Sequence, residues 1–233
     1  MRPLCPIVGI VDFRIEDITR DEIDRRLSVV EPLTDSVRDL VDAVIRSQVS
    51  DAELNAARAK IDEVVAALRT RQLPGGFGTP YTREFIGMPW GNAAVGARNA
   101  IAPPLRVTRS PGVAECDMQL GAAYEGPGGC VHGGVAALML DQLVGEAAST
   151  DGLPSFTGTL TVKYLRPTPL GALSARAEVT GREGRKTFVH ATLSDDDGVT
   201  VEADAIMISP KGFELPTGDA LPAPANSRAD TDV

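Results

Sequence analysis

Cysteine, histidine and aromatic residues are scarce in this sequence, and each scarcity argues against a class of protein. The 233 residues include three cysteines, at positions 5, 116 and 130, and 4% aromatic residues. An odd number of widely spaced cysteines provides no disulfide framework, which favours a reducing, cytoplasmic location. The two histidines, His132 and His190, have no second ligand at metal-binding spacing. We therefore expect neither a metal site nor a resident cofactor.

Long apolar runs and an excess of positive charge are also missing. No stretch approaches the roughly 20 apolar residues that span a bilayer, and Pro3 and Pro6 interrupt the short apolar start. We expect no membrane segment and no signal peptide. The net charge of −9 predicts no surface for nucleic acid. With 43% hydrophobic and 24% charged residues, the composition is that of a soluble globular protein.

The N-terminal third of the chain has the pattern of helices. Apolar residues recur at helical spacing from Val37 to Leu68, and Ser50 with Glu53 forms a capping box. Two helices joined near Ser50 are expected, with a weaker third over 17–29, as an appendage for packing or dimerisation. The predicted regions are a helical extension at 1–72, a Gly- and Pro-rich linker at 73–80, a second domain at 81–212 and a disordered tail at 213–233.

The sequence pattern of the second domain predicts strands, then one helix, and then more strands. Runs rich in Val, Thr, Phe and Ile predict strands near 104–110, 113–123, 155–166, 172–181, 186–195 and 199–208. Short turns between neighbouring strands indicate an antiparallel sheet. The fold class is therefore α+β, with a sheet that must curl round the one long apolar helix.

That helix should begin at the segment GGCVHGG, residues 128–134, and end near Ser149. It is apolar on almost every side, which is typical of a buried helix. Glycines at its start leave amide N–H groups open to an oxyanion. Asp141 interrupts the apolar run, and a carboxylate there either activates water, attacks an acyl carbon, or simply braces a neighbouring element.

The spacing of these groups has a geometric consequence. Asp141 lies roughly 12 Å along the helix from Gly133, at 1.5 Å per residue. One carbonyl group therefore cannot touch both groups of the same helix. Two antiparallel helices related by a two-fold axis would pair each Asp141 with Gly133 of the other copy.

Other candidate side chains have simpler interpretations. Cys130 lies two residues from His132 on a loop, and we expect it to pack rather than to act as a nucleophile. His190 alternates with Phe188 and Thr192, which favours a hydrogen-bonded histidine in a sheet. Trp90, the one tryptophan, is expected to anchor packing.

Four motifs in order carry a family resemblance. They are GGCVHGG, an Asp nine residues after the histidine, Tyr164-Leu165-Arg166-Pro167, and Glu183-Gly184-Arg185-Lys186. Together they resemble the hotdog-fold acyl-CoA thioesterases of the broad PaaI-like superfamily, and most closely a subgroup with animal mitochondrial members. The resemblance covers residues 81–210 and leaves the N-terminal helices mostly outside.

The resemblance implies a hotdog fold, in which a curved antiparallel sheet wraps a long central helix, and a homodimer or dimer of dimers with sites between helices. It implies that Asp141 acts as general base or nucleophile and that the Gly133 amide, with Gly134 beside it, donates to the oxyanion. His132 would shape that loop, and Thr157 would position the water or the carboxylate.

The resemblance also implies a substrate, an acyl-CoA, and a place in fatty acid metabolism. Arg166, Arg185 and Lys186 are the cations expected near the coenzyme A phosphates, although solvated turn charges are an equal alternative for each. Gly126 stands where some relatives carry an asparagine, which removes one oxyanion contact. Two other functions stay open: an acyl-CoA binding or sensing protein, and a hydratase or dehydratase of acyl thioesters.

Overall fold

The computed structural model describes residues 16–83, 86–152 and 154–211. The tail predicted at 213–233 lies outside the described residues, as does the beginning of the N-terminal extension. The elements are α1 (Arg20–Arg46), α2 (Asp51–Arg69), β1 (Arg106–Ser110), β2 (Val113–Leu120), the 3₁₀ turn η1 (Ala122–Tyr124), α3 (Gly133–Ala148), β3 (Phe156–Tyr164), β4 (Gly171–Glu183), β5 (Lys186–Asp195) and β6 (Gly198–Ile208).

The six strands form one antiparallel sheet in the order β1-β2-β4-β5-β6-β3. Each strand predicted from the sequence is present, with bounds that differ by at most a few residues. The chain leaves β2, forms α3, and returns to the sheet at β3, which lies at the edge beside β6. The predicted antiparallel α+β architecture is confirmed, and no other strand of the described residues pairs with the outer side of β3.

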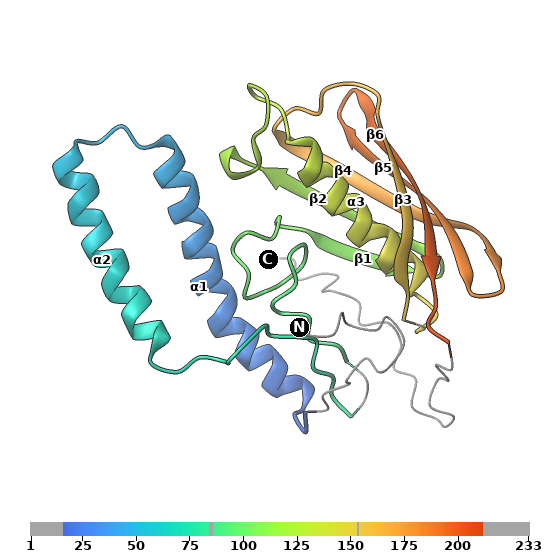
Figure 1. Ribbon diagram of the computed structural model, residues 1–233, viewed down its shortest axis with the longest axis horizontal. Coiled ribbons are helices and arrows are strands. Elements are labelled where there is room, and N and C mark those ends of the chain that lie inside the picture. The colour runs from blue at the N-terminus through green and yellow to red at the C-terminus, as the bar shows by residue number, and fades with distance from the viewer. Residues whose placement is uncertain (1–15, 84–85, 153, 212–233) are drawn as a thin grey trace, which may run out of the picture.

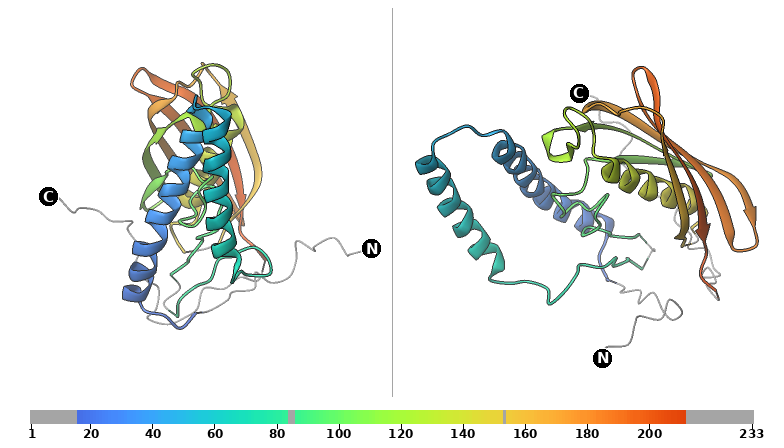
Figure 2. Two further views of the ribbon diagram at one scale, coloured as in Figure 1. Left: turned by 90° about the vertical axis from the view of Figure 1, so that its left-hand side faces the viewer. Right: turned by 45° about the horizontal axis from the view of Figure 1, so that its top comes forward.

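A row of four buried alanines crosses the inner face of the sheet. The register aligns Ala114 of β2, Ala177 of β4, Ala191 of β5 and Ala203 of β6, and each is at most 1% exposed. Such small side chains form a shallow trough that lets a helix approach closely. α3 contacts every strand of the sheet and lies along its concave side (Figures 1 and 2).

α3 supplies seven further residues of the core. Its buried residues are Ala136, Met139, Leu140, Leu143, Val144, Ala147 and Ala148. The predicted buried helix is therefore confirmed on the side that meets the sheet. The opposite side, which includes Ala137, Leu138 and Asp141, is only partly covered by the rest of the chain.

The N-terminal helix differs from the prediction. The separate helix expected over 17–29 is wrong, because α1 continues without a break through Pro32 to Arg46. An interior proline costs about 3 kcal/mol in a helix. Tertiary contacts on both sides of Pro32 offset this cost: Ile23 packs in a buried cluster with Trp90, and the Arg38 guanidinium donates to the carbonyl of Ala102.

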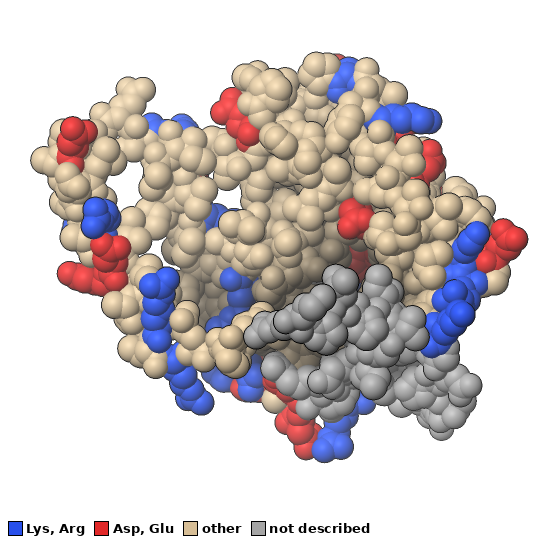
Figure 3. Space-filling model, in the orientation of Figure 1, with Lys and Arg blue, Asp and Glu red and all other residues tan. Residues whose placement is uncertain are grey.

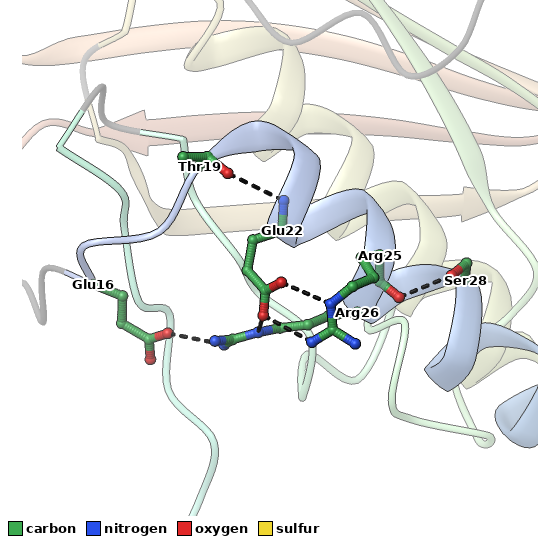
Figure 4. A network of polar contacts seen from close by, with 6 residues as sticks. All are labelled: Glu16, Thr19, Glu22, Arg25, Arg26 and Ser28. Carbon is green, nitrogen blue, oxygen red and sulfur yellow. Dashed lines mark hydrogen bonds and ion pairs between the residues drawn. The ribbon is translucent and has the colours of Figure 1, made fainter.

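The first turn of α1 is held by a polar network (Figure 4). The Thr19 hydroxyl accepts from the Glu22 N–H at 3.3 Å. Arg25 and Arg26 both donate to the Glu22 carboxylate, which lowers its pKa to about 2. Arg26 also reaches Glu16 upstream of the helix, so this network ties the helix start to the chain before it.

α2 stands away from the sheet domain in Figure 1 and in the right view of Figure 2. It begins with the predicted capping box between Ser50 and Glu53. None of its residues, all of them described, is buried, and the apolar side chains of Leu54, Val64 and Leu68 are about half exposed, at 45%, 53% and 52%. Within the described residues no helix is both long enough and apolar enough to cross a membrane.

Truncating the centre of the core should destabilise the protein strongly. Leu143 on α3 is 0% exposed, so we expect Leu143→Ala to lower the free energy of unfolding by about 2–5 kcal/mol, as other buried leucines do. Urea unfolding followed by circular dichroism measures this change. Leu54→Ala on α2 is the matched control, with an expected change within about 0.5 kcal/mol. Equal losses in both variants would contradict this account of the core.

Candidate active site

The loop before α3 is folded tightly enough to require glycine. Its turn is closed by hydrogen bonds from the Gly126 N–H to the Cys130 carbonyl and from the His132 N–H to the Tyr124 carbonyl, at 2.8 and 2.9 Å. A Cβ at position 126 would lie 2.7 Å from the His132 Cα, so no side chain fits there. The asparagine of some relatives is therefore excluded at Gly126 for a steric reason.

His132 caps α3 with its side chain. Its Nδ1 accepts from the Gly134 N–H at 3.0 Å, which requires the imidazole proton to be on Nε2 if the ring is neutral. The His132 carbonyl accepts from the N–H groups of Val135 and Ala136 at 2.8 and 3.2 Å. Three of the four N–H groups that begin the helix are thus satisfied locally.

The remaining N–H belongs to Gly133, and it has no acceptor among the described residues. Gly133 is the first residue of α3, where the helix dipole favours negative charge. The His132 cap therefore leaves one donor, at one position, for an external oxygen. The predicted oxyanion donor is available in the structure, and Gly134, named beside it, is already used by His132.

Asp141 lies in the middle of α3, on its partly covered side. Its Oδ1 accepts from the Thr157 hydroxyl at 2.8 Å, so the structure brings these two predicted residues together. Asp141 Oδ2 has no hydrogen-bond donor in the part of the chain that is described. One oxygen is therefore held by β3 and the other is open to a water molecule or a substrate.

Gly133 and Asp141 do not meet within one chain. They are eight residues apart on a continuous helix, which corresponds to about 12 Å. Each is contacted by a different end of β3: Thr157 reaches Asp141, and the Tyr164 hydroxyl donates to the Gly133 carbonyl at 2.8 Å. Sequence reasoning used Tyr164 only as part of a family motif and missed this contact.

The three predicted cations lie at opposite ends of the sheet. Arg166 follows Tyr164, at the Gly133 end, where its guanidinium binds the Asp195 carboxylate and the Gly198 carbonyl. Arg185 lies in the turn between β4 and β5, and Lys186 is the first residue of β5. Both are at the end where β3 begins, because Lys186 pairs with the same β6 residue as Phe156.

On the face in Figure 3, Lys and Arg side chains are scattered among Asp and Glu rather than gathered in one basic patch. Within a single chain, the strand register and the Asp195 pairing keep Arg166 apart from Arg185 and Lys186. A site that used all three would have to draw them from two copies.

The remaining polar candidates have structural roles. His190 Nδ1 lies 2.9 Å from the Asp204 carboxylate on the neighbouring strand, as predicted for a sheet histidine. Trp90 is 6% exposed and stacks on Phe77, which confirms the packing role. Burial raises the pKa of the Cys116 thiol to about 12. No three His, Cys, Asp or Glu side chains of the described residues converge as metal ligands.

The fold and this site define a class of protein. Residues 128–202 match the sequence model of the Thioesterase superfamily. A crystal structure of a thioesterase superfamily protein superposes with a TM-score of 0.68 and 28% identity, over 77% of this chain and 90% of that one. Residues 128–202 thus match the thioesterase superfamily, and the chain shares its fold with a protein of that superfamily, which confirms the resemblance and the hotdog fold predicted from the motifs.

Among curated proteins, the chain is similar to acyl-coenzyme A thioesterase THEM4 of Xenopus laevis, with 38% identity over 96 residues. It is also similar to the protein of that name from Rattus norvegicus, with 33% identity over 91 residues. These alignments cover 40% and 39% of this chain, and 43% and 39% of the relatives. The chain thus spans less than half the length of the curated relatives it matches.

The pairing of Arg166 with Asp195 should appear in the pH dependence of stability. Hydrogen bonds from Arg166 lower the pKa of Asp195 below its ordinary value. A carboxyl group with a lowered pKa stabilises the fold above its ordinary pKa of about 3.9 and loses that contribution as the pH falls through the folded value. We expect Asp195→Asn to be less stable than wild type at pH 7, with a difference that shrinks below about pH 4.

Urea unfolding midpoints at pH 7 and pH 3 measure this difference. Asp196→Asn, in the same turn and exposed, is the matched control and should follow wild type at both values. If the unfolding midpoints of Asp195→Asn and wild type differ by the same amount at pH 7 and pH 3, the ion pair is not the cause of that difference.

Proposed function

We propose that this protein is an acyl-CoA thioesterase, which hydrolyses an acyl-CoA to a carboxylic acid and coenzyme A. One observation carries the proposal: α3 presents an unused amide donor at Gly133 and a hydroxyl-held carboxylate at Asp141. An oxyanion donor and a base or nucleophile are the two groups that acyl transfer to water requires. The names of the curated relatives support the acyl-CoA substrate.

In the proposed reaction, the Gly133 N–H donates to the thioester carbonyl oxygen, on which negative charge develops. Asp141, acting as general base, takes a proton from water while the water oxygen attacks the carbonyl carbon. The carbon–sulfur bond then breaks, and the leaving thiolate takes the proton from Asp141 to give coenzyme A. Alternatively, Asp141 Oδ2 attacks the carbon itself and displaces the thiolate as the carbon–sulfur bond breaks. Water then cleaves the resulting anhydride, which releases the acid and restores the Asp141 carboxylate, and a proton from that water goes to the thiolate. In both cases the Thr157 hydroxyl holds Oδ1 and so directs the open Oδ2.

The proposed site forms between two copies of the chain. Two observations support a homodimer: the partly covered side of α3 carries Ala137 and Leu138 around Asp141, and within the described part of the chain β3 has one unpaired edge. An unpaired edge strand is a template for another strand. In a two-fold arrangement with antiparallel α3 helices, Gly133 of one subunit would lie opposite Asp141 of the partner subunit.

The same arrangement supports a binding site for the coenzyme A phosphates. Arg166 lies at the Gly133 end of the sheet, and Arg185 and Lys186 lie at the Asp141 end. Antiparallel pairing brings opposite ends of two subunits together. Arg166 of one subunit and the Arg185–Lys186 turn of the partner subunit would then flank the same active site, where their charges suit phosphate groups.

Removing the carboxylate should nearly abolish hydrolysis. We expect Asp141→Asn to lower the rate of thiol release about 10²- to 10⁴-fold, the usual range for loss of a general base. Asparagine retains an oxygen for the Thr157 hydroxyl, so the fold should be unchanged. The assay is thiol release from acyl-CoAs that range from acetyl to long-chain and aromatic, which also defines the substrate range.

The control is Asp151→Asn, which removes a carboxylate from an exposed ion pair with Arg182 beyond the end of α3. It should retain wild-type activity. Full activity in Asp141→Asn would eliminate the mechanism. Binding of acyl-CoA by wild type without any thiol release would favour the sensing function, and hydration of an enoyl-CoA, followed by absorbance, would favour the hydratase.

A mixing experiment tests whether the site is shared. Proline is tolerated at the first helical position and lacks an N–H, and the extended ψ of 130° at His132 suits a following proline. Gly133→Pro therefore removes the proposed donor, and its Cβ, 3.3 Å from the Tyr164 ring, requires that ring to shift by a few tenths of an ångström. Each variant alone should be inactive, whereas mixed dimers of Gly133→Pro and Asp141→Asn retain one intact site out of two.

We expect refolded equimolar mixtures to recover about a quarter of wild-type activity, because half of the dimers are mixed and each has one of its two sites. Mixing either variant with itself provides the control. An active monomer, or mixtures that stay inactive although mixed dimers form, would contradict a site built from two subunits.

A further inference from the structure

Tyr164, at the end of β3, makes a close contact with the first residue of α3. Its hydroxyl donates to the Gly133 carbonyl at 2.8 Å. A Cβ on Gly133 would lie 3.3 Å from the ring carbon Cε1 and 3.4 Å from Cζ, so the ring rests directly against the glycine. The tyrosine is nevertheless 55% exposed. This contact does not serve to bury the ring.

The hydrogen bond is also not needed to satisfy the Gly133 carbonyl. In an α-helix, the carbonyl of the first residue already accepts from the N–H four residues on. Tyr164 is therefore a second donor to the same oxygen, supplied from another element of the fold. Its effect is to fix the position of Gly133 relative to β3.

A bulge in β3 lets the strand hold both parts of the proposed site. Thr157 and Tyr164 are seven residues apart, and in a regular strand such residues point to opposite faces. The register with β6 shifts between Thr157 and Thr159, so that Gly158 is an extra residue. The shift turns Thr157 toward the same face as Tyr164, and both side chains reach α3.

The bulge depends on glycine. A Cβ at position 158 would lie 2.8 Å from Cγ1 of Ile208 and 3.1 Å from the carbonyl oxygen of Ile206. Both residues belong to β6, the neighbour of β3. Between the bulge and Tyr164, the side chains of Leu160 and Val162 pack against the core, which holds this segment of the strand in one register.

We propose that Tyr164 is a positioning residue of the thioesterase reaction: it holds the Gly133 amide, the proposed oxyanion donor, at the place where the carbonyl oxygen becomes negative. The inference rests on the proposed function and adds a residue to it. His132 restrains the helix start from the loop through Gly134, and Tyr164 restrains it from β3. Because Thr157 restrains Asp141 from the same strand, β3 sets the positions of both groups.

Tyr164→Phe tests this role, because it keeps the ring against Gly133 and removes only the hydroxyl. Outright loss of an oxyanion donor lowers kcat about 10²- to 10³-fold in known enzymes. Displacement of a retained donor should have a smaller effect, and we expect kcat to fall about tenfold or more with KM unchanged. Affinity for a thioether analogue of acyl-CoA, which has no carbonyl oxygen, should equal that of wild type.

The matched control is Tyr124→Phe. Tyr124 also donates its hydroxyl to a backbone carbonyl, that of Ala102, at 3.0 Å, and the loss of that bond should leave kcat unchanged. An unchanged kcat in Tyr164→Phe would overturn the inference. An increase in KM alone, with weaker binding of the thioether, would overturn it too, because Tyr164 would then contact the substrate.

A second measurement does not depend on activity. Amide resonances of Gly133 and Gly134 in ¹⁵N-labelled protein should shift in Tyr164→Phe and remain in place in Tyr124→Phe. If wild type hydrolyses no acyl-CoA, the proposed function fails, and these resonances alone then report on the contact. Unchanged resonances in Tyr164→Phe would show that the tyrosine does not hold Gly133, whatever the activity.

Discussion

The architecture depends on the close packing of one helix against a sheet lined with alanine. α3 is apolar on nearly all sides, so that it must be covered by the rest of the fold to be stable in water. The alanine row formed by Ala114, Ala177, Ala191 and Ala203 provides a trough for it across four strands. A larger side chain in that row would push α3 outward and move the groups at its start and middle.

The same helix makes the proposed site possible and also incomplete. Its first turn has one unused amide donor because the His132 side chain and carbonyl satisfy the other three N–H groups. Its middle carries Asp141 on the side that the sheet leaves partly open. Since a rigid helix keeps these groups apart, chemistry that needs both has to involve a second copy of the chain.

Much of the fold could be predicted from the sequence, because the signals were local. Alternation of apolar residues located the six strands, and the Gly-Gly start with its apolar run located α3. Asp141 was singled out as the carboxylate that interrupts the apolar run, Thr157 came from a family resemblance, and the structure brings the two side chains to 2.8 Å. The continuity of α1 through Pro32 was missed, because packing of distant residues on both sides of the proline offsets a local penalty.

By itself, the sequence determined the order of elements, the buried helix and the residue types able to stabilise an oxyanion and activate water, because periodicity and helix-start chemistry are properties of neighbouring residues. Only the tertiary structure decided which amide of the helix start stays unused. It also decided that Arg166 pairs with Asp195, at the opposite end of the sheet from Arg185. It also decided that the Gly158 bulge turns Thr157 and Tyr164 to one face of β3. These features depend on register and on contacts between distant segments, which no local pattern encodes.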